Sequence, residues 1–385
     1  MKNILSVTGC RSDYDLMHPV YQAIHQHPAL SLSLVVTGAH LSKQFGYTVQ
    51  AIEEDGFHVA ERIEALIDGD RDTSRLKSAA VQLMGLTQTV DRIRPDLLLI
   101  LGDREETITT AICGTYLNIP IAHISGGDRT IGNADDAIRH AVTKMAHIHF
   151  ATSEDSKKRI LKMGEQPSRV HFSGNPGIDR IASVKSLDKT TVFRHFNFDD
   201  NLINKPLLIV IQHVMSTETD AAYSQMKETL EAVKTLNLPT VLVYPNSDAG
   251  CRDIIRCINE YKEMPNLRIA KHIPREIFIN LLRFASCLIG NSSMGLLEAP
   301  FLKLPVVNIG NRQNQRFHAD NVMFVEHDTQ EIIEATKKAC TDSEYREYVK
   351  TLPCPFGEGS AAEYIAKTLA EVTLDTHFRI KEICY

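Results

Sequence analysis

Charged residues follow two short apolar runs in the first part of the chain. Residues 4–8 lead into Gly9 and Arg11, and residues 97–101 lead into Asp103 and Arg104. A planar guanidinium such as that of Arg11 can donate two hydrogen bonds at once to a diphosphate. An ordinary surface arginine on a connecting loop would explain Arg11 equally well. Arg11 therefore indicates either an anion site or an ordinary surface residue, and the choice stays open.

A second polar group follows the apolar run 119–124. Ser125 and Asp128 come just after this run, and Asp135 and Asp136 then begin a helical pattern with Arg139 one turn later. We expect Asp135 or Asp136 to cap the N-terminus of that helix, a role that by itself would account for both aspartates.

The second half of the chain has two comparable segments. His213 follows the run 207–212, and imidazole is the side chain whose protonation changes most readily near neutral pH. Ser292 and Ser293 form a turn between a predicted strand and a predicted helix, and Glu298 lies in that helix. Backbone N–H groups at a helix start can hold an anion. A structural histidine is an equally good explanation of His213 alone.

Other chemistries lack their sequence signals. No Gly-x-Gly-x-x-Gly follows the predicted strands, which argues against a dinucleotide redox site. The segment 290–295 narrowly misses the Gly-x-Ser-x-Gly of a serine hydrolase. His147 and His149 would share one face of a strand but have no third ligand at metal spacing, so we expect no metal. The basic face at 157–162 lacks aromatic residues, so we expect no nucleic-acid partner.

Short β-branched runs alternate with helical patterns throughout, as a doubly wound parallel sheet requires. We expect two such Rossmann-like α/β domains, at 1–176 and 177–365, with their strand ends facing each other across a ligand-binding cleft. Residues 366–385 would form a C-terminal helix and tail that packs back on the first domain. The predicted strands are 4–8, 32–37, 97–101, 119–124, 147–151, 169–172, 207–212, 240–244, 267–271, 287–290 and 305–309.

Composition sets the remaining limits. The 385 residues carry a net charge of -6, which offers no bulk attraction to nucleic acid or to an anionic membrane. The longest apolar runs are far too short to span a membrane, and residues 1–8 do not resemble a signal peptide. The eight cysteines match no zinc or redox spacing, which indicates reduced thiols and a cytoplasmic location.

Taken in order, the polar segments resemble the hydrolysing branch of the UDP-N-acetylglucosamine 2-epimerase family, from sialic-acid-type biosynthesis. Each segment is modest alone, but nine in register are specific. The resemblance implies the two-domain B-type glycosyltransferase fold, with UDP held mainly by the second domain. The segments are Gly9-Cys10-Arg11-Ser12-Asp13-Tyr14, Thr37-Gly38-Ala39-His40-Leu41, Gly102-Asp103-Arg104, His123-Ile124-Ser125-Gly126-Gly127-Asp128, Asp135-Asp136-Ala137-Ile138-Arg139-His140, Gln212-His213, Pro245-Asn246-Ser247-Asp248-Ala249-Gly250, Gly290-Asn291-Ser292-Ser293 and Gly310-Asn311-Arg312-Gln313.

The same resemblance implies roles for individual residues. Ser292, Ser293 and Arg11 would hold the diphosphate, Glu298 would accept from the ribose hydroxyls, and the backbone at His272 would recognise the uracil. Many relatives have Glu where this chain has Ser125, so another carboxylate must supply that proton transfer. The implied catalytic set is Asp103, Asp128, Asp135 and His213, and the implied substrate-binding set is Arg11, Arg104, His272, Ser292, Ser293, Glu298 and Arg312.

The implied reaction couples loss of the C2 proton to departure of UDP, giving a glycal to which water adds. The expected products are UDP and free N-acetylmannosamine, made by a homodimer without metal or other cofactor. Three alternatives remain: the same reaction on a UDP-2,4-diacetamido-trideoxy sugar of a legionaminic-type pathway, a B-type glycosyltransferase, and an inactive UDP-sugar-binding regulator. Retention of Asp103, Asp135 and His213 argues against the last of these.

Overall fold

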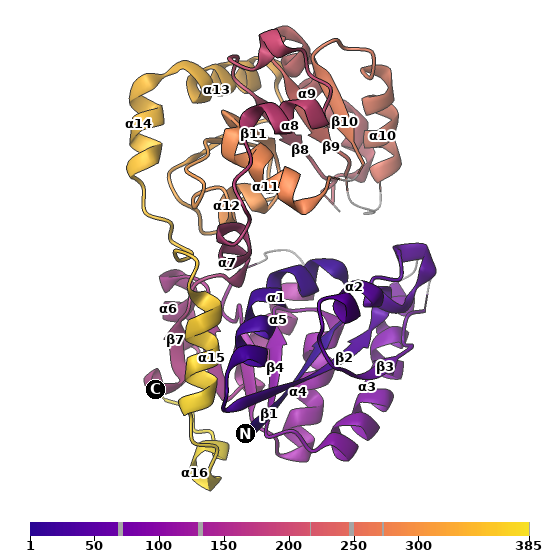
Figure 1. Cartoon of the computed structure of the whole chain (residues 1–385), viewed down its shortest axis with the longest axis vertical. Helices are drawn as coiled ribbons and strands as arrows, with labels where there is room; N and C mark the ends of the chain where they lie inside the picture. Colours follow the sequence, from indigo (N-terminus) through magenta and orange to yellow (C-terminus); the bar gives the residue numbers. More distant parts are fainter. Residues whose placement is uncertain (68–71, 130–133, 216, 246–249, 272, 385) are drawn as a thin grey trace. The chain divides into compact units, whose positions relative to one another are not determined.

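The computed structural model divides the chain into two compact units (Figure 1). Unit 1 comprises residues 1–182 and 356–385, and unit 2 comprises residues 183–355. The structure describes residues 1–67, 72–129, 134–215, 217–245, 250–271 and 273–384.

Unit 1 is built on a seven-stranded sheet in the order β3-β2-β1-β4-β5-β6-β7. Each pair of neighbouring strands in it is parallel, so every strand delivers its carboxyl end to the same edge. The strands are β1 (Lys2–Thr8), β2 (Leu30–Thr37), β3 (Val59–Ile63), β4 (Leu97–Leu101), β5 (Ile121–Ile124), β6 (Ile148–Ala151) and β7 (Val170–Phe172).

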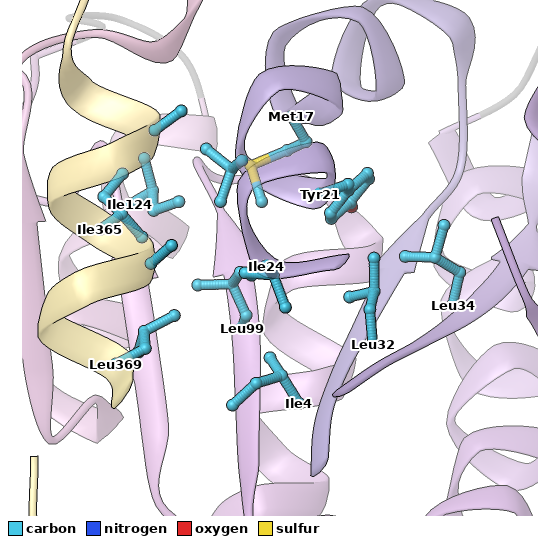
Figure 2. Close-up of a cluster of buried hydrophobic side chains, with 14 of the residues drawn as sticks. Ile4, Met17, Tyr21, Ile24, Leu32, Leu34, Leu99, Ile124, Ile365 and Leu369 are labelled. Atoms are coloured by element: carbon cyan, nitrogen blue, oxygen red, sulfur yellow. The ribbon is translucent and has the colours of Figure 1, made fainter. Parts of the chain in front are cut away.

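Helices cover both faces of this sheet, as a parallel sheet with apolar residues on both faces requires. The helices of unit 1 are α1 (Arg11–Gln26), α2 (Val49–Glu54), α3 (Asp72–Ile93), α4 (Glu105–Leu117), α5 (Ala134–Met145), α6 (Glu154–Lys162), α7 (Pro176–Ala182), α15 (Ala361–Glu371) and α16 (Thr376–Arg379). On one face, side chains of α1 and α15 pack over β1 and β4 (Figure 2). There Ile24, Ile365 and Leu99 belong to one buried cluster. A second cluster on the sheet includes Leu98 together with Leu86 and Val90 of α3.

The C-terminal helix α15 packs against α1 within unit 1. The carboxylate of Asp179, in α7, accepts hydrogen bonds from the backbone N–H groups of Ala361 and Ala362 at 3.2 and 2.8 Å. Because α7 and α15 are tied in this way, the unit boundaries lie at 182/183 and 355/356, rather than at the expected 176/177 and 365/366.

Unit 2 has a six-stranded parallel sheet in the order β10-β9-β8-β11-β12-β13. Its strands are β8 (Leu208–Ile211), β9 (Thr240–Val243), β10 (Leu267–Ala270), β11 (Cys287–Gly290), β12 (Val306–Ile309) and β13 (Val322–Val325). Its helices are α8 (Lys189–His195), α9 (Ala222–Leu236), α10 (Cys251–Glu260), α11 (Arg275–Phe284), α12 (Met294–Leu297), α13 (Thr329–Thr341) and α14 (Ser343–Thr351). The predicted α/β class with two parallel sheets is confirmed.

Two strands were absent from the sequence-based expectation, and both lie at sheet edges. β3 carries Glu61 and Arg62, which form ion pairs with Arg92 and Glu53 on the surface. β13 has a single buried residue, Val322, and Phe324 is 42% exposed. Edge strands commonly carry charged or exposed side chains because they pack less completely. Neither segment therefore shows the continuous apolar run of a central strand.

Candidate functional site

Arg139 joins two of the predicted catalytic carboxylates in unit 1. Asp103 follows β4, Asp128 follows β5, and Arg139 reaches them from α5. Arg139 Nη2 pairs with Asp103 Oδ2, and its Nη1 lies 4.0 Å from Asp128 Oδ2. Nη1 also donates to the carbonyl oxygen of Ser125 at 2.8 Å. The Arg139 side chain is only 9% exposed, so these contacts are made largely out of water. The sequence pattern predicts no role for Arg139, which lies in the segment 135–140.

Asp128 is further fixed by hydroxyl donors. Its Oδ1 accepts hydrogen bonds from Thr152 Oγ1 at 2.9 Å and from Ser156 Oγ. Thr152 follows β6 and Ser156 lies in α6, so adjacent parts of the same sheet edge hold this carboxylate. The backbone before Asp128 turns through Ser125 at φ 62° and Gly127 at φ 74°. Asp128 is thus held in one orientation beside Arg139.

The pKa of Asp103 is shifted by its burial and by the charges beside it. Burial raises the pKa of Asp103, the neighbouring charge of Arg139 opposes this rise, and repulsion from Asp135 adds to it. A carboxyl group whose pKa is raised by burial and by a second carboxylate keeps its proton to a higher pH than a free carboxyl group does, which suits it to acid/base work. The structure therefore brings Asp103, Asp128 and Asp135 into one charged group.

The predicted helix-cap role of Asp135 and Asp136 is wrong. Helix α5 begins at Ala134, so both aspartates lie inside its first turn. Asp135 Oδ1 pairs with Arg75 Nη2 at 3.1 Å, and Arg75 Nε also pairs with Glu105. Arg75 comes from α3, which the local sequence pattern around Asp135 could not reveal.

Arg104 lies within 3.5 Å of a second pair of carboxylates. Its Nε is 3.5 Å from Asp13 Oδ2 and 3.5 Å from Glu106 Oε2. Burial raises the pKa of Asp13 to about 6, with Arg104 opposing the rise and Glu106 adding to it. The sequence pattern predicts no role for Asp13, whose one signal is its position two residues after Arg11. Arg11 itself is exposed at the first position of α1.

A hollow of about 260 Å³ lies beside Arg104. Its polar side is formed by Arg104, Glu106 and the backbone near Gly9. A Cβ atom on Gly9 would lie 1.7 Å from Glu106 Oε1, so only glycine leaves room for this carboxylate. The hollow is lined by Gly9, Gly38, Ala39, Phe45, Ala65, Leu66, Ile67, Arg75, Ser78, Gln82, Arg104, Glu105 and Glu106.

In unit 2 the predicted residue His213 is positioned by Asn291. Asn291 Oδ1 accepts from the His213 backbone N–H at 2.7 Å, and Asn291 Nδ2 donates to the His213 carbonyl oxygen at 2.9 Å. The carbonyl oxygen of Asn291 accepts hydrogen bonds from Arg312 Nη1 at 3.1 Å and from Gln313 Nε2 at 2.9 Å. His213 and Arg312 therefore meet at Asn291, for which the sequence pattern predicts no role.

The loop after β11 begins beside Gly290, whose backbone lies very close to that of Ile211. Gly290 has φ 129°, and a Cβ there would lie 2.1 Å from the carbonyl oxygen of Ile211. Glycine alone fits this position. The following residues Ser292 and Ser293 are half-buried, and Met294 N lies 3.4 Å from Ser292 Oγ. Helix α12 is a single turn and ends before Glu298, which is its C-terminal cap rather than an interior residue as expected. His272 lies outside the described residues.

The histidines weighed as metal ligands have other partners. His149 Nε2 lies 3.0 Å from Glu165 Oε2, and His147 Nδ1 accepts from the Ile121 backbone N–H at 3.2 Å. Over the described ranges, no three His, Cys, Asp or Glu side chains are grouped as metal ligands would be. Within the described ranges, each helix is too short or too polar to span a membrane.

Comparison with known proteins identifies the family of this chain. The family described as UDP-N-acetylglucosamine 2-epimerase matches residues 22–370. The chain is 34% identical to a hydrolysing UDP-N,N'-diacetylbacillosamine 2-epimerase of Legionella pneumophila, covering 100% of this chain and 99% of the relative. It is 29% identical to a UDP-N-acetylglucosamine 2-epimerase of Neisseria meningitidis serogroup B, covering 89% of this chain and 88% of the relative.

The fold is shared with a solved structure. The crystal structure of a Neisseria meningitidis UDP-GlcNAc 2-epimerase bound to UDP-GlcNAc matches with a TM-score of 0.82 and 20% sequence identity. The match covers 96% of this chain and 100% of that chain. At this identity the match shows the fold alone, which is the one expected from the sequence.

Proposed function

Because the chain belongs to the UDP-N-acetylglucosamine 2-epimerase family, we propose that it is a hydrolysing 2-epimerase acting on a UDP-2,4-diacetamido-2,4,6-trideoxy sugar. The products are UDP and the free sugar with inverted configuration at C2. The observation that carries this choice of substrate is the 34% identity to the Legionella pneumophila enzyme over all of this chain. The sequence alone placed the monoacetamido substrate UDP-N-acetylglucosamine first.

The charged groups of unit 1 suit the chemistry at the sugar. The C2 hydrogen is removed as a proton while the C1–O bond to UDP breaks, which gives a 2-acetamidoglycal. A proton is then returned to the opposite face of C2, and the oxygen of water bonds to C1. Asp103, Asp128 and Asp135 are our candidates for these proton transfers, and Arg139 orients the first two.

The groups of unit 2 suit the departing UDP. We assign the diphosphate to Ser292, Ser293 and Arg312, with Arg11 of unit 1, because hydroxyl and guanidinium donors stabilise the developing charge. We assign His213 to acid/base work, supported by the way Asn291 fixes its backbone. Glu298 remains our candidate for the ribose hydroxyls, and the backbone at His272 our candidate for the uracil.

UDP-N-acetylglucosamine is the second candidate substrate. The relative from Neisseria meningitidis serogroup B, 29% identical, carries that name. The two candidates differ at C4 and C6 of the sugar, where one has an acetamido group and a methyl group and the other has hydroxyl groups.

The test is incubation with each UDP-sugar in deuterated water, followed by mass spectrometry of the free sugar. We expect faster release of free sugar from the diacetamido substrate, with one deuterium at C2 and no requirement for an acceptor. Protium at C2, or a strict requirement for an acceptor sugar, would contradict the epimerase mechanism. A preference for UDP-N-acetylglucosamine would leave the mechanism in place and replace the substrate.

A further inference from the structure

We propose that the hollow of unit 1 beside Glu106 binds the C4 acetamido group of the sugar and thereby selects the diacetamido substrate. This inference rests on the proposed function. The hollow lies entirely within unit 1. Complete ligand sites usually enclose about 300–1,000 Å³, so a hollow of about 260 Å³ is the size of a subsite for part of a ligand.

Glu106 supplies the polar end of this subsite. Residue Glu106 is 8% exposed, and its Oε2 atom is buried with no hydrogen-bond partner among the described residues. The contact of Oε2 with Arg104 Nε, at 3.5 Å, is too long for a good hydrogen bond. A buried carboxylate oxygen without a donor is costly, which makes an incoming N–H group favourable there. The amide N–H of an acetamido group is such a donor.

Arg104 can complete the recognition of the amide. Its side chain is 45% exposed and lines the same hollow as Glu106. An amide has one N–H donor and one carbonyl acceptor, so it matches a carboxylate beside a guanidinium. A C4 hydroxyl could also donate to Glu106, and the polar end alone therefore does not separate the two substrates.

The apolar side of the hollow distinguishes the diacetamido substrate from UDP-N-acetylglucosamine. Phe45, Leu66 and Ile67 are 44%, 41% and 39% exposed, and all three line this one hollow. Large apolar side chains gathered at an open site indicate an apolar ligand surface. The acetamido methyl group, and the C6 methyl group next to it on the sugar, would cover them. The hydroxyl groups of the monoacetamido substrate would leave these side chains in contact with water.

The experiment compares kcat/KM for the two UDP-sugars in Leu66→Ser, Ile67→Ser and Ala39→Leu. The first two remove apolar contact, and the third fills the hollow. Loss or gain of a few methyl-sized contacts changes selectivity by about 10-fold or more. We expect each variant to lose at least about 10-fold in kcat/KM for the diacetamido substrate and less than about 3-fold for UDP-N-acetylglucosamine.

Leu76→Ser is the matched control, because Leu76 is 72% exposed on α3 and does not line the hollow. Leu66 and Ile67 are partly exposed, so their serine variants should fold, and thermal unfolding of each variant checks this. If the wild-type enzyme prefers the diacetamido substrate but the variants lose neither or both activities equally, the subsite assignment is overturned and the proposed function stands. If the wild-type enzyme releases sugar only from UDP-N-acetylglucosamine, the proposed substrate and the subsite both fail.

Discussion

Asn291 makes two hydrogen bonds to the backbone of His213. Its Oδ1 accepts from the His213 N–H at 2.7 Å, and its Nδ2 donates to the His213 carbonyl oxygen at 2.9 Å. The two residues follow β8 and β11, which are neighbours in the sheet of unit 2. Because Asn291 is 3% exposed, these hydrogen bonds are protected from water. The position of the His213 loop is thus set by a side chain from the loop that follows the neighbouring strand.

Asn291→Ala should lower kcat by about 100-fold, because we assign His213 to acid/base work and small displacements of such a group are costly. The loss of buried hydrogen bonds should also destabilise the protein by about 1–3 kcal/mol. Steady-state kinetics and chemical denaturation measure the two effects. Asn321→Ala is the control, since Asn321 is equally buried and donates to the Leu304 carbonyl oxygen at 2.9 Å. Equal losses of activity in both variants would mean that Asn291 acts only through stability.

Arg139→Lys should keep the positive charge but lose the pair of hydrogen bonds that the guanidinium donates to Asp103 and to the Ser125 carbonyl oxygen. The pKa of Asp103, already raised by burial, should rise further because the hydrogen bond from the Arg139 guanidinium, one of the contacts that lower this pKa, is lost. The limb of the pH–rate profile that reports Asp103 should therefore move to higher pH, and kcat should fall. Arg139→Gln should destabilise the protein by about 3–5 kcal/mol, because it leaves a buried carboxylate unpaired. An unchanged pH–rate profile in Arg139→Lys would separate Asp103 from catalysis.

Asp13→Asn should stabilise the protein in a pH-dependent way. The pKa of Asp13 is raised from 3.8 to about 6, so the native state binds this proton more tightly than the unfolded chain does. Wild-type stability therefore falls as pH rises from about 4 to about 6, and the variant should lack this fall. The difference, on the order of 2–3 kcal/mol, should appear above pH 6 and vanish below pH 4. Thermal unfolding across this pH range tests it, and a constant difference would contradict it.

Glu165→Gln should loosen the C-terminal segment. Glu165 is fully buried and pairs with Lys144 at 2.7 Å and Lys381 at 2.8 Å. Although burial raises its pKa, hydrogen bonds from His149, Lys144 and Lys381 lower the pKa of Glu165 from 4.5 to about 2. Its contribution to stability is therefore present above pH 4.5 and is lost as pH falls toward 2.

Removing this charge should cost about 3–5 kcal/mol at pH 7, because the partly buried Lys381 loses its partner. Hydrogen exchange of residues 375–384, measured by mass spectrometry, should become faster in Glu165→Gln. Glu363→Gln, at an exposed position of α15, is the control. Unchanged exchange in the C-terminal segment would show that other contacts hold it.

The double change of Ser292 and Ser293 to Ala should weaken UDP binding, and Arg11→Ala should do so as well. Each hydrogen bond to a charged group contributes about 1.5–3 kcal/mol, so affinity should fall about 10-fold or more. Calorimetry with UDP is the measurement, and Ser224→Ala on α9 is a control for an exposed hydroxyl. Unchanged affinity in both variants would place the nucleotide elsewhere.

The central strands and the polar residues at their ends followed from local sequence. β4 is a run of five apolar residues, and such a run can only be buried on both faces. The next residues must then emerge at the carboxyl edge, so the place of Asp103 was predictable from its distance to Leu101. The same reasoning located His213 and Ser292. It missed β3 and β13, because an edge strand is covered incompletely and need not be apolar throughout.

The partners of these residues were decided by tertiary structure alone. Asp103 and Arg139 are far apart in the sequence and meet because β4 lies beside β5, with α5 following it. Asn291 reaches His213 because β11 lies beside β8. Hydrophobic periodicity indicates which side of a helix or strand is buried, but it does not indicate which helices and strands become neighbours. That order depends on how all the strands and helices pack together, and it determines which charges meet and therefore which pKa values are shifted.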